Sequence, residues 1–205
     1  MANLKEIRSR ITSVGSTMQI TSAMKMVSAA KLKRAQDAVT QMRPYSNKLS
    51  ELLKNLSSSL DSSDGGVYAQ KRKLSNVLLV VITSNRGLCG GFNANILKKT
   101  KELVDVEYKN IKVDILSIGK KSSEYFSKNN YNVVGKHDDL FIDLTYSNTA
   151  NIAEDIMAKF ENSDYDEVAL VYNQFKNAAT QIIMAENFLP IQSETNNDIV
   201  VGDYI

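Results

Sequence analysis

The sequence predicts an α/β fold in which one long N-terminal coiled-coil helix precedes a mostly parallel sheet with an antiparallel edge hairpin. Apolar residues recur with a heptad period over the opening segment, a continuous β-branched run follows, and strands and helices then alternate. The 205 residues, 43% apolar and 23% charged, have the composition of an ordinary folded chain. We expect a shaft helix at residues 1–60, a linker at 61–73, an α/β domain at 74–190 and a C-terminal segment at 191–205.

An apolar seam runs along the predicted first helix. Alternating steps of three and four residues keep one register over seventeen positions, thirteen of them apolar: Leu4, Ile7, Ile11, Val14, Met18, Thr21, Lys25, Ser28, Leu32, Ala35, Val39, Met42, Ser46, Leu49, Leu53, Leu56 and Leu60. This period indicates a left-handed coiled coil. At Thr21, Lys25 and Ser28 we expect looser packing or a change of partner, and Pro44 predicts a bend near Arg43. No later segment of the sequence carries a second long heptad run, so we expect the covering partner to come from elsewhere.

The charge is unevenly distributed. Residues 1–56 contain ten Lys or Arg and three Asp or Glu, a net charge of +7, which leaves −5 for the rest of a chain whose total is +2. A basic segment suits an acidic partner or nucleic acid. A nucleic-acid-binding coiled coil is therefore one hypothesis, but the long apolar seam between the cations counts against it.

The second half of the sequence alternates strands with helices. Ser57 to Gly66 reads as a loop, and Asn93 is expected to cap the first helix of the domain, whose apolar stripe includes Ile96, Leu97, Leu103 and Val104. The expected strands are 76–83, 113–118, 131–134, 168–175 and 180–189, and further helices are expected at 122–129 and about 149–160. This order predicts a Rossmann-like, mostly parallel sheet whose last two strands form a hairpin.

A glycine-rich turn follows the first strand, where doubly wound folds bind phosphate. Gly87, Gly90 and Gly91 fit neither common phosphate-binding motif, so a tight structural turn is favoured over a nucleotide site. Cys89 lies near a helix start and could be a nucleophile, but we expect a buried structural cysteine. His137 is expected to be a solvated loop residue. With one Cys and one His in the sequence, we expect no metal and no cofactor.

Two segments resemble the gamma subunit of the F-type (rotary) ATP synthase. They are Met1 to Tyr45, especially Lys5-Glu6-Ile7-Arg8, Ile20 to Val27, Ala30-Lys31 and Arg43-Pro44-Tyr45, and the motif Arg86, Gly87, Leu88, Cys89, Gly90, Gly91, Phe92 and Asn93. The resemblance runs along the whole chain but covers about the first two thirds of the family's usual length. In that family a long C-terminal helix pairs with the N-terminal one, so we expect the natural chain to continue past Ile205.

The resemblance implies a non-catalytic rotor shaft that couples rotation of a membrane ring of c subunits to ATP synthesis or hydrolysis. The implied partners are the alpha and beta subunits of the catalytic head, the epsilon subunit and the c ring, with no nucleic acid. The implied contact residues are Arg8, Arg10, Met24, Lys25, Lys31, Lys33 and Arg34 on the shaft and Tyr204 near the foot, while the glycine motif is foot structure. The alternative is a nucleotide-binding α/β protein with a basic partner-binding helix.

The sequence departs from the family's usual residues at two places, and these differences affect only the contacts expected at those positions. Met18-Gln19 stands where the family commonly has Gln-Lys, and Asn85 stands where Asp is common. The single cysteine excludes the cysteine-paired regulatory insert of chloroplast members. The opening residues lack the apolar core of a signal peptide, so we expect a peripheral protein held by its partners on the cytoplasmic face of a bacterial membrane.

Overall fold

A computed structural model describes residues 3–59 and 66–191. The chain forms two compact units, Met1–Leu53 and Lys54–Ile205. The first consists of most of one helix, and the second contains a five-stranded sheet with helices on both faces.

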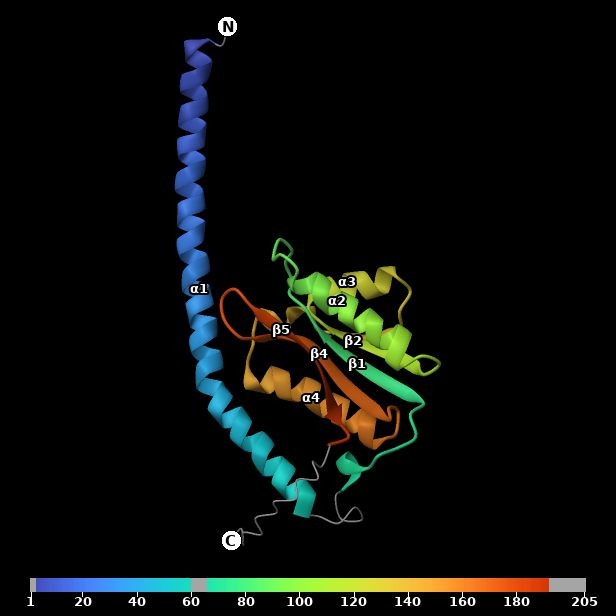
Figure 1. Ribbon diagram of the computed structural model, residues 1–205. Coiled ribbons are helices and arrows are strands. Elements are labelled where there is room, and N and C mark those ends of the chain that lie inside the picture. The colour runs from blue at the N-terminus through green and yellow to red at the C-terminus, as the bar shows by residue number, and fades with distance from the viewer. Residues whose placement is uncertain (1–2, 60–65, 192–205) are drawn as a thin grey trace. The chain divides into compact units, whose positions relative to one another are not determined.

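Helix α1 spans Leu4–Ser59, 56 residues without interruption, as the heptad pattern predicts. At 1.5 Å per residue it is a rod about 80 Å long. Pro44 lies inside the helix, and Figure 1 shows the axis changing direction between the blue and cyan parts of α1. A proline lacks the N–H that the preceding turn needs and its ring crowds a carbonyl of that turn, which explains a bend without a break.

The sheet has the predicted mixed topology, with strand order β3-β2-β1-β4-β5 (Figure 1). Its strands are β1 (Asn76–Ile82), β2 (Lys112–Ile118), β3 (Val133–Lys136), β4 (Glu167–Phe175) and β5 (Gln181–Leu189). The first four are mutually parallel, and β5 returns antiparallel beside β4. The parallel strands bring the carboxyl ends of β1, β2 and β3 to one edge of the sheet.

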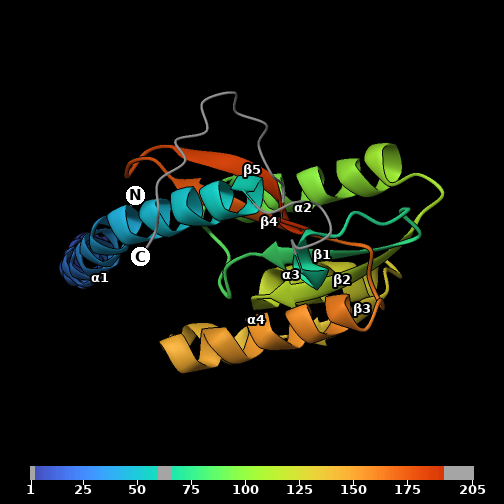
Figure 2. The same cartoon turned by 90° about the horizontal axis from the view of Figure 1, so that it is seen from below.

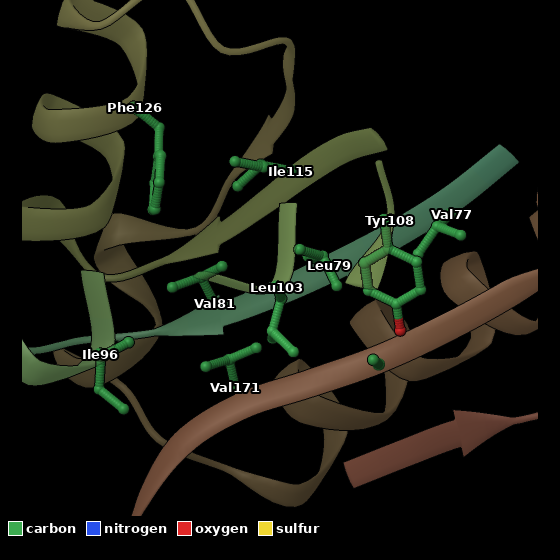
Figure 3. Close-up of a cluster of buried hydrophobic side chains, with 10 residues drawn as sticks. Val77, Leu79, Val81, Ile96, Leu103, Tyr108, Ile115, Phe126 and Val171 are labelled. Carbon is green, nitrogen blue, oxygen red and sulfur yellow. The ribbon is translucent and has the colours of Figure 1, made fainter. Parts of the chain in front are cut away.

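Helices cover both faces of the sheet, as two views show (Figures 1 and 2). Helices α2 (Phe92–Glu102) and α3 (Lys120–Lys128) pack on one face, and α4 (Tyr146–Glu161) packs on the other. Residues Val77 to Val81 of β1 are at most 1% exposed because the strand is covered on both sides. Figure 3 shows side chains of α2, α3 and three strands meeting in the first of these two cores. Each such buried aliphatic side chain contributes about 1.5 to 3 kcal/mol.

Several predicted boundaries were wrong by two or more residues, among them the start of α3 at Lys120 and the end of α1 at Ser59, and side-chain contacts explain two others. The third strand was expected at 131–134 but lies at Val133–Lys136, because the Tyr131 ring packs edge-on against Phe126 with centroids 5.1 Å apart. The fourth helix was expected from about Thr149 but begins at Tyr146, because the Thr145 hydroxyl accepts a hydrogen bond of 3.3 Å from Asn148 N–H.

A π-helical turn at Leu103–Glu107 extends α2. Tyr108 N–H donates to the Leu103 carbonyl at 2.9 Å, five residues back. The extra residue in the turn rotates Tyr108 into the core, where its hydroxyl donates to Glu167 at 2.6 Å. Burial, and then this carboxylate, raise the pKa of Tyr108 above its ordinary value.

The segment before β1 is hydrogen-bonded to α4 and to the chain just beyond the last strand. Arg72 donates to the Phe160 carbonyl at 2.7 Å and lies over the Phe160 ring at 4.7 Å from its centroid. Ile191, two residues beyond β5, donates its N–H to the Tyr68 carbonyl at 2.8 Å. The described part of the predicted linker, residues 66–73, thus packs on the domain at the point where the chain also leaves the sheet.

Candidate functional site

The seam of α1 presents two rows of exposed apolar side chains, one on each side of Thr21, Lys25 and Ser28. The exposed members are Leu4, Ile7, Ile11, Val14, Met18, Leu32, Val39, Met42, Leu49 and Leu53. A folded protein rarely leaves so long a stripe of large apolar residues in water unless a partner covers it. The described residues therefore carry the uncovered seam that the heptad pattern predicts.

The polar positions of the seam differ in chemistry. Thr21 donates its hydroxyl to the Thr17 and Met18 carbonyls, at 2.9 and 3.0 Å. Because this hydroxyl is satisfied by its own helix, Thr21 can present its methyl group to a partner. Lys25 is the one charged residue among the seventeen seam positions. The interruption is therefore centred on Lys25.

The predicted contact residues on the shaft, Arg8, Arg10, Met24, Lys25, Lys31, Lys33 and Arg34, are all exposed. Arg10 pairs with Glu6 at 2.7 Å, which takes up one of its donors. Within the described part of the chain, Lys25, Lys31, Lys33 and Arg34 form no ion pair. The four cations are therefore available to an acidic partner. Tyr204 lies outside the described residues.

The motif at residues 86–93 is a hydrogen-bonded loop at the end of β1. Asn93, which is buried, accepts from Ser84 N–H at 3.0 Å and donates to the Arg86 carbonyl at 3.1 Å. Leu88 and Gly90 adopt positive φ angles of 58° and 59°. These angles turn the chain outwards, so the Leu88 side chain is fully exposed at the tip. Of the three glycines, only Gly90 requires the unusual backbone angle that the turn hypothesis assigned to the group.

Two expectations for this motif were wrong. Gly91, not Asn93, is the N-cap of α2, because the Asn93 side chain reaches back across the loop to Ser84 instead of capping its own helix. Cys89 is exposed and not buried, because the loop projects away from the sheet. Its thiol lies 3.8 Å from the Arg86 carbonyl oxygen.

The start of α3, at the carboxyl ends of β1 and β2, is hydrogen-bonded to the protein's own groups. Backbone N–H groups at the start of α3 donate to Asn85 Oδ1 at 2.8 Å and to Thr83 Oγ1 at 2.9 Å. A Cβ at Gly119 would lie 2.1 Å from the Thr83 carbonyl oxygen, so the two backbones already touch. These two donors at the start of α3 are thus occupied by the protein's own side chains.

Asn85 is a residue whose role the sequence did not reveal. Besides accepting from Lys120 N–H, it donates to the Asp138 carbonyl at 2.7 Å and so ties together the ends of three strands. In the sequence, its position directly after the first strand is the feature that could have indicated this role.

His137 is half-buried beside β3 and donates its backbone N–H to the Ser117 carbonyl at 2.8 Å. It is thus less solvated than expected. The described residues contain no group of three or more His, Cys, Asp or Glu side chains that could hold a metal ion. No described helix has the length and hydropathy needed to cross a bilayer.

Comparison with known proteins agrees with these features. A family model described as ATP synthase matches residues 3–204. The ATP synthase gamma chain of Flavobacterium johnsoniae is 56% identical over 208 residues, covering 100% of this chain and 71% of that one. The gamma chain of Cytophaga hutchinsonii is 46% identical, covering 95% of this chain and 67% of that one.

Solved structures of ATP synthases also contain chains similar to this one. A chain in the central stalk and c-ring structure of the Tetrahymena thermophila mitochondrial ATP synthase matches with a TM-score of 0.62 and 27% identity, over 83% of this chain and 72% of that one. The rotor of the Euglena gracilis mitochondrial ATP synthase, with a TM-score of 0.58 and 24% identity over 88% and 60% of the two chains, supports the fold alone. From the matched family model and the gamma chain relatives, the chain belongs to the ATP synthase gamma chain family.

Proposed function

We propose that the chain is the non-catalytic central rotor shaft of a proton-driven F-type ATP synthase. The observation that carries this proposal is the exposed apolar seam of α1, which is long, regular and without cover among the described residues. A stiff helix transmits torque along its axis once a second helix or a surrounding ring of subunits buries that seam. The chain would then couple rotation to chemistry in other subunits and would itself make and break no bond.

The partners follow from the two units. We assign α1 to the cavity formed by the alpha and beta subunits of the catalytic head, and the α/β unit to contacts with the epsilon subunit and the c ring. In this assignment residues 1–60 are the shaft, 61–73 a linker, 74–190 the foot, and 191–205 lead towards a second shaft helix. The protein would be peripheral, held by these partners at the cytoplasmic face of a bacterial membrane.

The cations of α1 have a smaller role. Lys25, Lys31, Lys33 and Arg34 are exposed, and each pair with an acidic loop of the head would contribute about 0 to 1 kcal/mol and would weaken with salt. They would guide the fit of the shaft, while burial of the seam would supply most of the binding energy. Replacing Lys31, Lys33 and Arg34 together by Gln should therefore weaken assembly more at low than at high ionic strength.

Seam burial can be tested in the assembled complex. Ile11→Asp puts a charge on the seam, and Ser9→Asp puts the same charge on the opposite side of the same helical turn. We expect Ile11→Asp to reduce ATP-driven proton pumping in inverted membrane vesicles by at least about tenfold, because a buried unpaired carboxylate is costly. Complexes that carry Ser9→Asp should pump protons at nearly the rate of the unmodified complex. Equal pumping by both variants would contradict the proposal.

A further inference from the structure

A hollow with acidic walls lies beside α4, in the α/β unit. It has a volume of about 590 Å³ and is formed by the segment from Lys136 to Asp143 and the first turns of α4. Its floor includes Leu140 and Ile152, and four carboxylates line it: Asp138, Asp139, Asp143 and Asp155.

A ridge of exposed apolar side chains borders the hollow. Ile142 is 79% exposed and Tyr146 is 89% exposed, and Phe141 and Leu144 beside them are also exposed. Four large apolar residues within six positions form a patch of the kind that marks an interaction surface. The ridge meets the hollow at Ile142, which belongs to both.

The carboxylates retain free acceptor capacity. Asp155 pairs with Lys159 at 2.6 Å, whereas the Asp139 side chain has no hydrogen-bond or ion-pair partner in the described ranges. With Lys136 and Lys159 set against the four Asp, the site keeps a net charge of −2. The surface is therefore apolar and acidic at once.

We propose that the acidic hollow and its apolar ridge dock a basic, amphipathic segment of a partner polypeptide. Its Lys or Arg side chains would meet Asp139 and Asp155, and an apolar side chain would enter the hollow beside Ile142. The negative charge repels nucleic acid and anionic lipid, and the site's acids form no metal-binding group among the described residues. This assignment uses only contacts within the α/β unit and does not depend on the proposed rotor function.

The test uses two synthetic helical peptides with the same apolar pattern, one of Lys and Leu and one of Glu and Leu. Binding to the full chain is measured by fluorescence anisotropy at low and at physiological ionic strength. We expect the basic peptide to bind, and Asp139→Asn with Asp155→Asn to weaken that binding about tenfold through loss of two ion pairs. Ile142→Ser alone should weaken it several-fold by removing the apolar contact.

A matched control lies elsewhere on the same unit. Asp105, Val106 and Glu107 form an exposed acid–apolar–acid triplet on the π-helical turn, and none of them lines the acidic hollow. Asp105→Asn with Glu107→Gln should leave binding of the basic peptide unchanged. Thermal unfolding checks that each variant is folded.

Three results would overturn the assignment. One is that the Asp139/Asp155 variant and the Asp105/Glu107 variant weaken binding of the basic peptide equally. That result would indicate general attraction to an acidic surface. Another is tight binding of the Glu peptide to the same site. The third is binding of vesicles containing anionic lipid that Ile142→Ser abolishes, which would make the ridge a lipid contact.

Discussion

The hydroxyl of Tyr165 donates a hydrogen bond of 3.0 Å to Asp114, a carboxylate on β2 that is only 5% exposed. Asn132 donates to the other oxygen of Asp114 at 2.7 Å, so three segments meet at one buried charge. Burial, and then the Asp114 carboxylate, raise the pKa of Tyr165 above its ordinary value. This group joins β2 to the chain entering β4.

Removing the Tyr165 hydroxyl should therefore destabilise the α/β unit. We expect Tyr165→Phe to lower the free energy of unfolding by about 1.5 to 3 kcal/mol, the usual range for a hydrogen bond to a charged group. Tyr146→Phe is the control, because Tyr146 is 89% exposed and should be neutral. Urea unfolding of both variants measures the difference. If Tyr165→Phe lowers the free energy of unfolding no more than Tyr146→Phe does, the hydrogen bond between Tyr165 and Asp114 adds no stability.

The pair Tyr172 and Glu186 predicts alkaline sensitivity of the hairpin. Burial, and then the hydrogen bond of 2.9 Å to Glu186, raise the pKa of Tyr172 to about 12. The unfolded chain has the ordinary pKa of about 10, so the stabilisation is complete below pH ~10 and is lost between there and pH ~12. Tyrosinate absorbance should show a residue titrating near the upper value, and Tyr172→Phe should remove it. Titration of all tyrosines near the ordinary value would contradict this.

Gly119 should tolerate no side chain. It has φ of +103°, and a Cβ there would meet the Thr83 carbonyl oxygen at 2.1 Å. We expect Gly119→Ala to cost at least about 3 kcal/mol, because backbone strain and a backbone clash add together. Gly87→Ala meets nothing within 4 Å and has no positive φ, so it should be near neutral. Circular dichroism during thermal unfolding distinguishes the two.

The thiol of Cys89 should react in the native protein. The side chain is exposed on the projecting loop, and it is the single cysteine of the sequence. We expect a maleimide reagent to label the folded chain almost as fast as the urea-unfolded chain, and Cys89→Ser to abolish labelling. The substitution should change stability by less than about 0.5 kcal/mol, as exposed positions usually do. Strong protection of the native thiol would show that the loop packs against the domain.

The features that could be predicted from the sequence depend on local periodicity. The α1 seam follows from its heptad spacing, and the run from Val77 to Ile82 identifies a strand covered on both faces. The antiparallel hairpin follows from the short connection between the last two strands. The exposure of Ile11 and Leu32 could likewise be expected, since no second heptad run was present to cover them.

The features that could not be predicted depend on specific side-chain contacts and on unusual backbone angles. Asn93 looked like a cap because the sequence does not show that Ser84 lies within its reach. Cys89 looked buried because the outward course of the loop depends on the positive φ of Leu88, which a leucine rarely adopts. The start of β3 depended on the packing of Tyr131 against Phe126. In each case a specific contact or backbone angle overrode the local pattern.

The backbone hydrogen bond between Ile191 and Tyr68 joins the two points where the described chain enters and leaves the sheet. Because the segment that enters the sheet and the segment that leaves it are hydrogen-bonded to each other, the points where the described chain enters and leaves the sheet lie close together, as in many domains that tolerate new connections. Lengthening or shortening the preceding helix in the sequence should then leave the sheet undisturbed. A circularly permuted version, with residues 68 and 191 joined by a short peptide and new ends opened at the exposed Lys176 to Thr180 turn, should keep the same fold.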